Sequence, residues 1–174
     1  PNIDTVVDMS CATGLFTRRF VQKYPRVFGC DYSDSMLTEA RRQSSSSSSG
    51  STNQKLTWIR CDVGQLPMQS HSVPALHAGA AMHCWPELVQ GLSEIYRVLQ
   101  PSGRYFATTF LSSYFGRLQQ AGGTSNQVST QAFQYFGSVE ELRDLCVAGG
   151  FARHLVDIEV LGNACVVIRC EKEA

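Results

Sequence analysis

The sequence predicts an α/β fold: a doubly wound sheet of about seven strands, mostly parallel, with an antiparallel last strand. Apolar segments with the period of strands alternate along the chain with segments that have the period of helices. Near the start, an apolar strand runs into an acid and the small residues SCATG before helical periodicity begins. Near the end, only Gly162-Asn163 separates two strands, a turn too short for a parallel crossover. We expect a single domain over residues 1–174.

The first half of the chain is predicted to contain three strands and two helices. Residues Thr13–Tyr24 have the helical period and stop at Pro25, which cannot continue a helix. Ser33 is a suitable cap for a second helix with apolar residues at Met36, Leu37 and Ala40. The serine-rich segment 44–52 has low complexity and cannot pack a core, so we expect a mobile loop. The strands are predicted at Val6–Asp8, Arg26–Cys30 and Lys55–Cys61.

The second half continues the alternation with one interruption. Ser138 and Glu141 form a capping box for a helix over Val139–Ala148. The polar, glycine- and glutamine-containing segment Leu111–Phe136 interrupts the pattern before that helix. Pro86 suits the first turn of an earlier helix, whose apolar face is Leu88, Leu92, Ile95 and Leu99. The remaining strands are predicted at Ser72–Ala81, Arg104–Phe110, Arg153–Leu161 and Cys165–Cys170.

Composition and charge exclude several classes of function. Fifteen basic and fifteen acidic side chains cancel and neither sign forms a block, which argues against binding to nucleic acid or to an anionic membrane. No apolar run is long enough to span a bilayer. The chain begins PNIDTVV without an initiator methionine, so we expect a fragment whose targeting peptide would lie upstream. Seven cysteines, an odd number without a CxxC pair, favour a reducing compartment over a disulfide framework.

Three acids follow the first three predicted strands, namely Asp8, Asp31 and Asp62. Ligands of open α/β sheets bind at the carboxyl ends of the strands, so these acids are candidate ligand contacts. Asp31 lies about twenty residues beyond the small-residue loop, where a carboxylate can accept both hydroxyls of a ribose. Asp62 is placed to accept from an exocyclic amine such as that of adenine. The alternative is that each acid only caps the helix that follows it; the three together favour a nucleoside ligand.

The small-residue loop does not have the spacing GxGxxG. A dinucleotide needs that loop because its pyrophosphate binds at the helix N-terminus, and Asp8 would repel a phosphate there. The acid instead suits a cationic group such as the ammonium of an amino acid. A nicotinamide-dependent oxidoreductase is therefore disfavoured.

The motifs together resemble the class I S-adenosylmethionine-dependent methyltransferases, which have a Rossmann-like fold. The resemblance rests on VVDMSCATG, DYSDSMLTEAR, CDVGQLPM, HAGAAMHCWPE, EIYRVLQPSGRY and QYFGSVEELRDLCVAGGF, and covers nearly all of the chain in the family's order. The HAGAAMHCWP stretch looks like plant and algal plastid methyltransferases related to the quinone-methylating group. This resemblance implies S-adenosyl-L-methionine as the cofactor and a chloroplast location.

The resemblance also implies which residues contact the cofactor. Asp31 would bind the ribose, and Ala12 stands where the family normally has glycine. If that position needs a positive φ, alanine costs on the order of 1 kcal/mol and its methyl narrows the cofactor approach. The methionine part would be lined by Asp8, Ser10, Ala12 and Gly14. The nucleoside would be flanked by Tyr32, Met36, Asp62 and Val63, with Ala78 and Gly79 on the opposite wall.

Methyl transfer needs alignment and desolvation, and a base only where the acceptor must lose a proton. His83 follows the fourth strand and is the candidate catalytic base, although it could simply bond to its loop. His77 lies inside the strand and is interpreted as structural. Trp85 either stacks on a ring of cofactor or acceptor or packs under the next helix. Arg18 and Arg19 are interpreted as a solvated helix face.

Cysteines follow each of the first four strands, which raises the alternative of a zinc or redox cluster. Parallel strand order spreads such residues apart, and cysteine is often a small buried residue, so we predict no metal site. These cysteines are Cys11, Cys30, Cys61 and Cys84.

The function predicted is methyl transfer to a small hydrophobic or aromatic acceptor, such as a lipid or a quinone-like molecule. In this family the segment at residues 111–136 forms a substrate lid, although its composition also suits a surface loop. Its aromatic residues would wall an apolar acceptor: Tyr114, Phe115, Phe133, Tyr135 and Phe136. The alternative function is a non-catalytic module that binds S-adenosylmethionine but has lost turnover through Ala12. The acceptor and the oligomeric state do not follow from the sequence.

Overall fold

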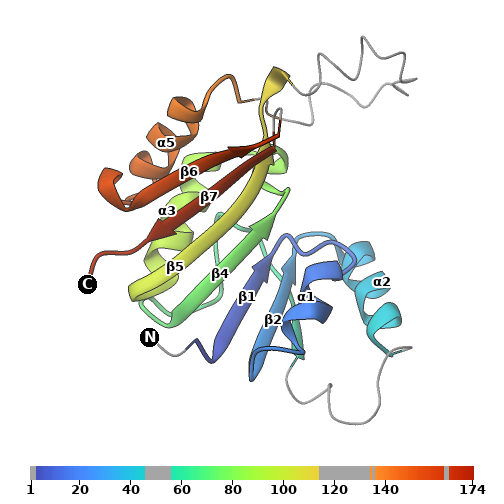
Figure 1. The fold of residues 1–174 in the computed structure, drawn as a ribbon. Helices are drawn as coiled ribbons and strands as arrows, with labels where there is room; N and C mark the ends of the chain where they lie inside the picture. Colours follow the sequence, from blue (N-terminus) through green and yellow to red (C-terminus); the bar gives the residue numbers. More distant parts are fainter. Residues whose placement is uncertain (1–2, 46–55, 114–133, 135, 163–164) are drawn as a thin grey trace, which may run out of the picture.

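The computed structural model describes residues 3–45, 56–113, 134, 136–162 and 165–174. Its centre is one sheet of seven strands in the order β3-β2-β1-β4-β5-β7-β6 (Figure 1). The first five strands in sequence are parallel, β7 is antiparallel to β5, and β6 is antiparallel to β7. The predicted fold class and the antiparallel last strand are confirmed. The strands are β1 Thr5–Met9, β2 Arg26–Asp31, β3 Leu56–Arg60, β4 Val73–Gly79, β5 Leu99–Phe110, β6 Val156–Leu161 and β7 Cys165–Glu171.

Helices cover the two faces of the sheet over different strands. The helices are α1 Leu15–Phe20, α2 Asp34–Ser45, α3 Leu88–Val98 and α5 Val139–Ala148, with short 3-10 turns η1 Met82–Cys84 and η2 Arg153–Leu155. Figure 1 shows α1 and α2 beside β1 and β2, and α3 and α5 towards β5, β6 and β7. Because successive strand residues face opposite sides, Asp8 on β1 points to the α1 face while its neighbours Val7 and Met9 join the main core.

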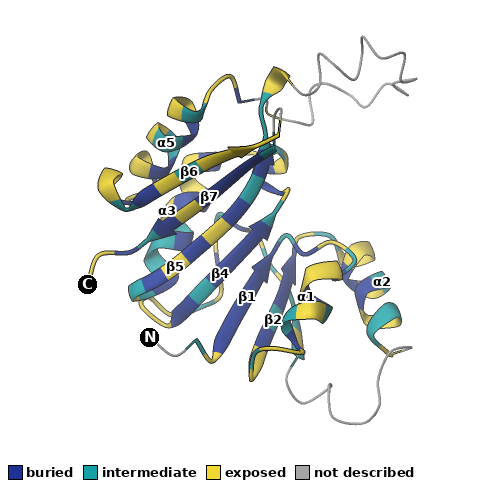
Figure 2. Ribbon diagram, viewed as in Figure 1, coloured by how far each residue is buried: buried dark blue, intermediate teal, exposed yellow. Residues whose placement is uncertain are grey.

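The main core lies between the sheet and the pair α3 and α5. Leu92 and Ile95 of α3 and Leu142 of α5 are fully buried in it. Tyr105 of β5 stacks on Phe151 with 6.0 Å between ring centroids. Figure 2 shows buried residues along β1, β2 and β4, and exposed residues on the outer sides of α1 and α5. Both faces of the central strands are therefore covered by packed side chains, which fix the positions of the carboxyl ends of these strands.

Several element boundaries differ from the predicted ones. The helix predicted over Thr13–Tyr24 is limited to Leu15–Phe20, because Gly14 takes a left-handed φ of 77° at its start and residues 21–23 form turns. Strand β5 begins at Leu99, so the predicted break at residues 100–103 lies within the strand, where Ser102 has a φ of 57°. Of the predicted strand Arg153–Leu161, the first three residues form η2. Residues 46–52 and most of 111–136, including the predicted lid, lie outside the described residues.

Candidate active site

The loop between β1 and α1 adopts a left-handed backbone at every second residue. Ser10 has a φ of 56°, Ala12 a φ of 49° and Gly14 a φ of 77°. Glycine adopts this conformation without strain, whereas other L-residues lose roughly 1–2 kcal/mol. A side chain at Gly14 would also be too close to Trp58, whose Cη2 atom would lie 2.6 Å from the added Cβ. Ala12 therefore has the positive φ at which we expected alanine to cost free energy. Ser10 has a positive φ as well.

Asp31 joins this loop to the carboxyl end of β2. Its Oδ2 accepts a hydrogen bond from the Ala12 amide at 2.8 Å, and its Oδ1 accepts one from the Ser33 amide at 2.8 Å. Ser33 Oγ accepts from the Met36 amide at 3.4 Å, so the capping role at α2 belongs to Ser33 as predicted. Each Asp31 oxygen retains a second lone pair, which is the arrangement needed to accept two vicinal hydroxyls.

Asp8 lies beneath α1 and not on the open side of the loop. Its Oδ2 accepts from the Thr17 hydroxyl at 2.5 Å, and its Oδ1 is 2.7 Å from His77 Nδ1. Only 2% of Asp8 is exposed, and His77 is surrounded by the rings of Phe16, Phe20 and Phe106. The carboxylate therefore anchors α1 to β4, and this geometry disfavours the direct ammonium contact that we expected of Asp8. It agrees with the structural interpretation of His77.

Asp62 and Val63 lie where β3 gives way to the loop leading to β4. Asp62 is exposed and its Oδ1 accepts from the Gly64 amide at 2.8 Å. Val63 is buried against Gly91 of α3, since a methyl group at Gly91 would be 3.3 Å from both Val63 γ-carbons. A cavity of about 50 Å³ lies beside them and is lined by Asp62, Val63, Gly64, Pro86, Glu87 and Gln90.

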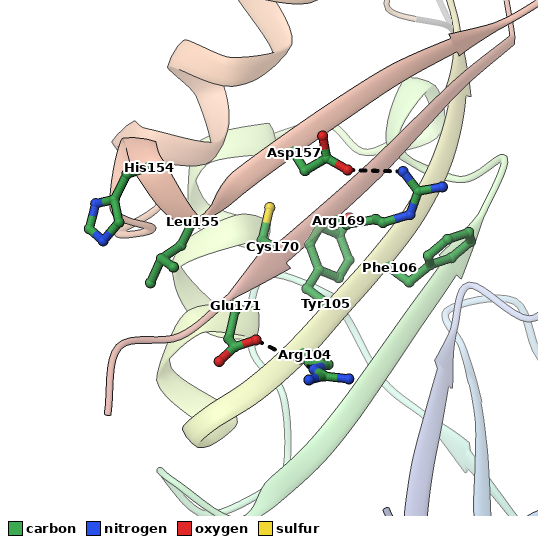
Figure 3. Close-up of a pocket in the computed structure, with 9 residues that line it drawn as sticks. All are labelled: Arg104, Tyr105, Phe106, His154, Leu155, Asp157, Arg169, Cys170 and Glu171. Atoms are coloured by element: carbon green, nitrogen blue, oxygen red, sulfur yellow. Dashed lines mark hydrogen bonds and ion pairs between the residues drawn. The ribbon is translucent and has the colours of Figure 1, made fainter. Parts of the chain in front are cut away.

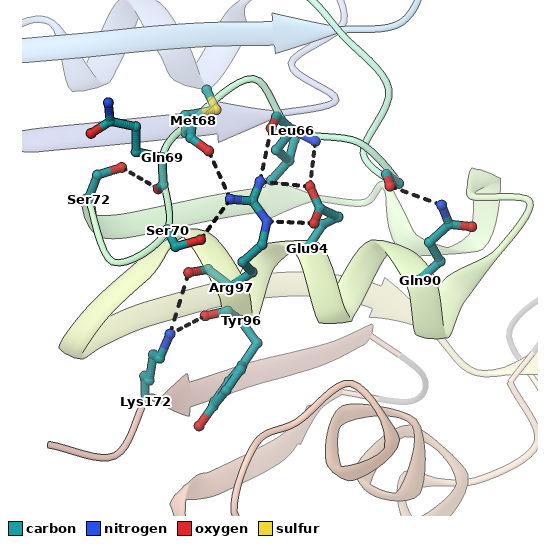
Figure 4. A network of polar contacts seen from close by, with 11 residues as sticks. Leu66, Met68, Gln69, Ser70, Ser72, Gln90, Glu94, Tyr96, Arg97 and Lys172 are labelled. Atoms are coloured by element: carbon teal, nitrogen blue, oxygen red, sulfur yellow. Dashed lines mark hydrogen bonds and ion pairs between the residues drawn. The ribbon is translucent and has the colours of Figure 1, made fainter.

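A charged pair on α3 fixes this loop (Figure 4). Glu94 accepts from the Leu66 amide at 2.7 Å, and Arg97 donates to the carbonyls of Leu66 and Met68, at 3.0 Å each. Arg97 also donates to both carboxylate oxygens of Glu94, at 2.6 and 2.9 Å. This hydrogen bonding holds the pKa of Glu94 below its ordinary value. The network positions the segment that begins with Asp62 and was not foreseen from the sequence.

Tyr32 and Met36 expose large apolar surfaces next to Asp31. Tyr32 is 68% exposed and Met36 is 42% exposed. The Arg60 guanidinium lies 6.0 Å from the Tyr32 ring centroid. Ala78, by contrast, is fully buried in the core and presents no surface to a ligand, whereas Gly79 is half-buried and lies close to the His77 ring. Of the nucleoside wall expected at Ala78 and Gly79, only Gly79 is therefore partly exposed.

His83 and Trp85 belong to a segment after β4 that we call the bridge loop (Met82–Pro86). The His83 ring lies 6.0 Å from that of Phe110, and burial lowers the pKa of the imidazole. Trp85 is 3% exposed and packs against Gly91, which favours the packing interpretation over stacking on a ligand. Its indole Nε1 donates to Ser10 Oγ at 3.0 Å, a contact that the sequence did not predict.

The cysteines near the site are free thiols. Burial, with the carboxylates of Asp8 and Asp31, raises the pKa of Cys11 to about 12, so this thiol is not reactive at neutral pH. The described residues contain no group of three or more His, Cys, Asp or Glu side chains arranged to hold a metal ion.

A larger cavity of about 400 Å³ lies elsewhere, on the sheet face over β5, β6 and β7 (Figure 3). Its charged side chains are paired, with Arg169 3.0 Å from Asp157 and Arg104 3.4 Å from Glu171. It contains none of the predicted site residues and lies away from the carboxyl ends of the parallel strands. We therefore place the site at the β1–α1 loop.

The fold is an α/β domain with a candidate nucleoside site at the carboxyl ends of its parallel strands, and comparison with known proteins specifies the family. The model of the methyltransferase domain family matches residues 6–103. The chain belongs to this family, and the predicted class, S-adenosylmethionine-dependent methyltransferases, is confirmed for the domain. None of the helices in the described ranges is both long and apolar enough to cross a membrane.

The chain is also similar to individual methyltransferases of known sequence or structure. An uncharacterized chloroplastic methyltransferase of Arabidopsis thaliana is 36% identical over 147 residues, which is 83% of this chain and 41% of the relative. A ubiquinone/menaquinone biosynthesis C-methyltransferase of Desulfotalea psychrophila is 29% identical over 171 residues, 87% of this chain and 67% of that protein. The S-adenosylmethionine-dependent methyltransferase structure from Methanosarcina mazei has a TM-score of 0.77 at 17% identity, covering 99% of this chain and 94% of that one. The chain spans less than half the length of the Arabidopsis relative.

Proposed function

We propose that the protein transfers the methyl group of S-adenosylmethionine to a small hydrophobic or aromatic acceptor. One observation carries the proposal: the left-handed β1–α1 loop is joined through the Ala12 amide to Asp31. A loop of this kind brings backbone amides close to a ligand, and the carboxylate beside it suits a ribose without a 2′-phosphate. The family match at residues 6–103 supports the same cofactor.

Each part of the cofactor has a proposed set of contacts. Asp31 accepts from the ribose hydroxyls, and exposed Tyr32 and Met36 cover the sugar and the base. Asp62 and Val63 flank the adenine, with Gly79 on the opposite wall and Ala78 buried behind it. The methionine part lies along the backbone of Ser10, Ala12 and Gly14. Asp8 is a positioning residue that does not contact the cofactor. Its carboxylate bonds to Thr17 and His77 and so holds α1 against β4.

The reaction is an in-line displacement on the sulfonium methyl. The acceptor's electron pair forms the new bond to the methyl carbon, the carbon–sulfur bond breaks, and S-adenosylhomocysteine leaves as a neutral thioether. Where the acceptor carries a proton, His83 is the proposed base that takes it up. Burial favours the neutral form of His83, which is the form that accepts a proton.

The acceptor is proposed to be apolar and ring-bearing, either a lipid or a quinone-like molecule. Phe110 lies beside His83, and Phe136 is buried near the end of the segment predicted as a lid. One relative is named for methylation in quinone biosynthesis and another is named chloroplastic. These names support a quinone-like acceptor and a plastid location. The balanced charge of the chain predicts that the acceptor is not a nucleic acid.

The second candidate function is a module that binds the cofactor without turning it over. The left-handed backbone at Ala12 favours it, because a methyl group stands where the family normally has glycine. Ala12 is exposed on the loop surface, so its methyl narrows the space that the methionine part occupies.

Labelled methyl transfer separates the two functions. The protein is incubated with S-adenosylmethionine carrying a labelled methyl group and with a plastid lipid and pigment extract. The methyltransferase proposal predicts label in an organic-soluble product, and much less label when Asp31→Ala replaces the parent at a cofactor concentration that does not saturate the variant. Tight binding of S-adenosylhomocysteine without any labelled product would instead support the binding module.

A further inference from the structure

The contact between Trp85 and Ser10 joins two loops that lie far apart in the sequence. The indole Nε1 of Trp85 donates to Ser10 Oγ at 3.0 Å across a separation of 75 residues. Ser10 is held at a φ of 56°, a conformation that costs a serine free energy and costs a glycine little. The hydrogen bond is made in the strained conformation, so it offsets part of that cost.

The bridge loop that presents Trp85 is itself held from the other side. Gln134 donates from its backbone N–H to the His83 carbonyl at 2.7 Å. Its side-chain Nε2 donates to the carbonyls of Trp85 and Pro86, at 2.6 and 3.1 Å. Trp85 therefore makes its bond to Ser10 from a fixed backbone, with His83 two residues away in the same loop.

We propose that Trp85 is a positioning residue for the cofactor. Its indole N–H holds Ser10 in the left-handed conformation that a glycine would adopt unaided, and it sets the distance between the β1–α1 loop and the loop that carries His83. This inference rests on the proposed function, since the methionine part of the cofactor is assigned to Ser10. It also explains how the loop functions with a serine at this position.

Four variants test the pair through the affinity for S-adenosylhomocysteine, measured by titration calorimetry. Ser10→Ala retains the backbone cost and loses the acceptor, so the affinity should fall about five- to tenfold. Trp85→Phe keeps an aromatic ring against Gly91 and loses the donor, so it should fall by a similar factor. Ser10→Gly removes both the acceptor and the backbone cost, and its affinity is the reference for the double variant. The double variant Ser10→Gly with Trp85→Phe should bind more tightly than Trp85→Phe alone, because glycine needs no support.

That rescue distinguishes positioning from packing. If Trp85 only packs under α3, Ser10→Gly will not recover the affinity lost in Trp85→Phe, and this outcome would overturn the proposal. In a double-mutant cycle the packing loss of Trp85→Phe appears in both backgrounds and cancels.

Thermal unfolding without ligand separates this proposal from the cofactor assignment. The melting temperature should fall about 2–4 °C more for Trp85→Phe in the parent than in the Ser10→Gly background. If the parent binds no S-adenosylhomocysteine but the cycle shows this coupling, the proposed function is wrong. The inference that Trp85 stabilises the left-handed conformation of Ser10 then still stands. If Trp85→Phe lowers the melting temperature equally in both backgrounds, Trp85 does not stabilise the conformation of Ser10.

Discussion

At the scale of single residues, the β1–α1 loop combines strain with compensation. Ala12 and Ser10 take left-handed conformations that glycine takes without cost. Each is supported by a specific contact: the Ala12 amide bonds to Asp31, and the Ser10 hydroxyl bonds to Trp85. The conformation of the loop is thus set by hydrogen bonds as well as by its own sequence. Its stability and its affinity for a ligand should both respond to single substitutions.

Replacing Ala12 with Gly should stabilise the protein. Relief of the left-handed strain should raise the free energy of unfolding by about 1 kcal/mol, after allowing for the greater freedom of glycine in the unfolded chain. Urea unfolding measures the change. Ala152→Gly is the matched control, because Ala152 has an ordinary φ of −66° and the same substitution there should destabilise the protein by about 0.4–1 kcal/mol. If Ala12→Gly destabilises the protein by as much as Ala152→Gly, the backbone at Ala12 is not strained.

Replacing Asp31 with Ala should weaken the binding of S-adenosylhomocysteine at least tenfold. Two charge-assisted hydrogen bonds to the ribose are lost, each worth about 1.5–3 kcal/mol before water replaces them. Asp34→Ala, three residues along on the exposed start of α2, is the control and should change the affinity less than twofold. Equal affinities for Asp31→Ala and the parent would show that Asp31 only fixes the two backbone amides.

His83 should produce an acidic limb in the pH profile of turnover. Burial lowers its pKa below the ordinary 6.5, so the imidazole stays neutral to lower pH and activity should fall only below that value. His83→Gln should remove the limb and reduce turnover by about 10²-fold or more. The control is His154→Gln, an exposed histidine in η2, which should leave the profile unchanged. A loss under about threefold for His83→Gln would exclude base catalysis by this residue.

At the scale of elements, the sequence predicts the strands and helices better than their contacts. Periodicity identifies the seven strands, but the helical period around Phe16 and Phe20 continues into turn residues and overextends α1. All five residues of β1 are buried, so no alternation shows that Asp8 faces α1. Asp31 is recognisable from its place at a strand end. The Ser10–Trp85 contact is not, because it depends on how two distant loops meet in space.

The α3 network should be a measurable element of stability. Glu94→Gln removes the charge that Arg97 and the Leu66 amide share, and should lower the free energy of unfolding by about 1–2 kcal/mol at pH 7. The pKa of Glu94 is depressed in the folded state, so its contribution is present above the ordinary value of 4.5 and is lost as the pH falls below it. Urea unfolding at pH 7 and pH 4 should therefore show a difference between parent and variant that shrinks at pH 4.

Glu39→Gln is the matched control for that substitution. Glu39 pairs with Arg42 at the same i,i+3 spacing on α2, where the two side chains are 36% and 73% exposed. Solvent screens this pair, so the stability should change little. Equal effects of the two substitutions would mean that Glu94 does not hold the loop to α3.

At the scale of the whole molecule, the fold brings the residues of the proposed site together. Parallel strand order brings the ends of β1, β2 and β4 to one edge of the sheet, and the carboxylate of Asp31 and the bridge loop meet the β1–α1 loop there. A cavity of about 400 Å³ lies on the other part of the sheet, over β5 to β7, and its charged side chains are already paired with one another. Strand topology and the left-handed residues of the β1–α1 loop support the proposed cofactor position.

The central claim is that this edge binds S-adenosylmethionine and not a dinucleotide. The most direct measurement is the melting temperature with S-adenosylhomocysteine and, separately, with NAD, each at millimolar concentration. A ligand present at about 100 times its dissociation constant stabilises the folded state by roughly 2.7 kcal/mol, so the melting temperature should rise by several degrees with S-adenosylhomocysteine. NAD should cause no shift. A clear shift with NAD and none with S-adenosylhomocysteine would contradict the account.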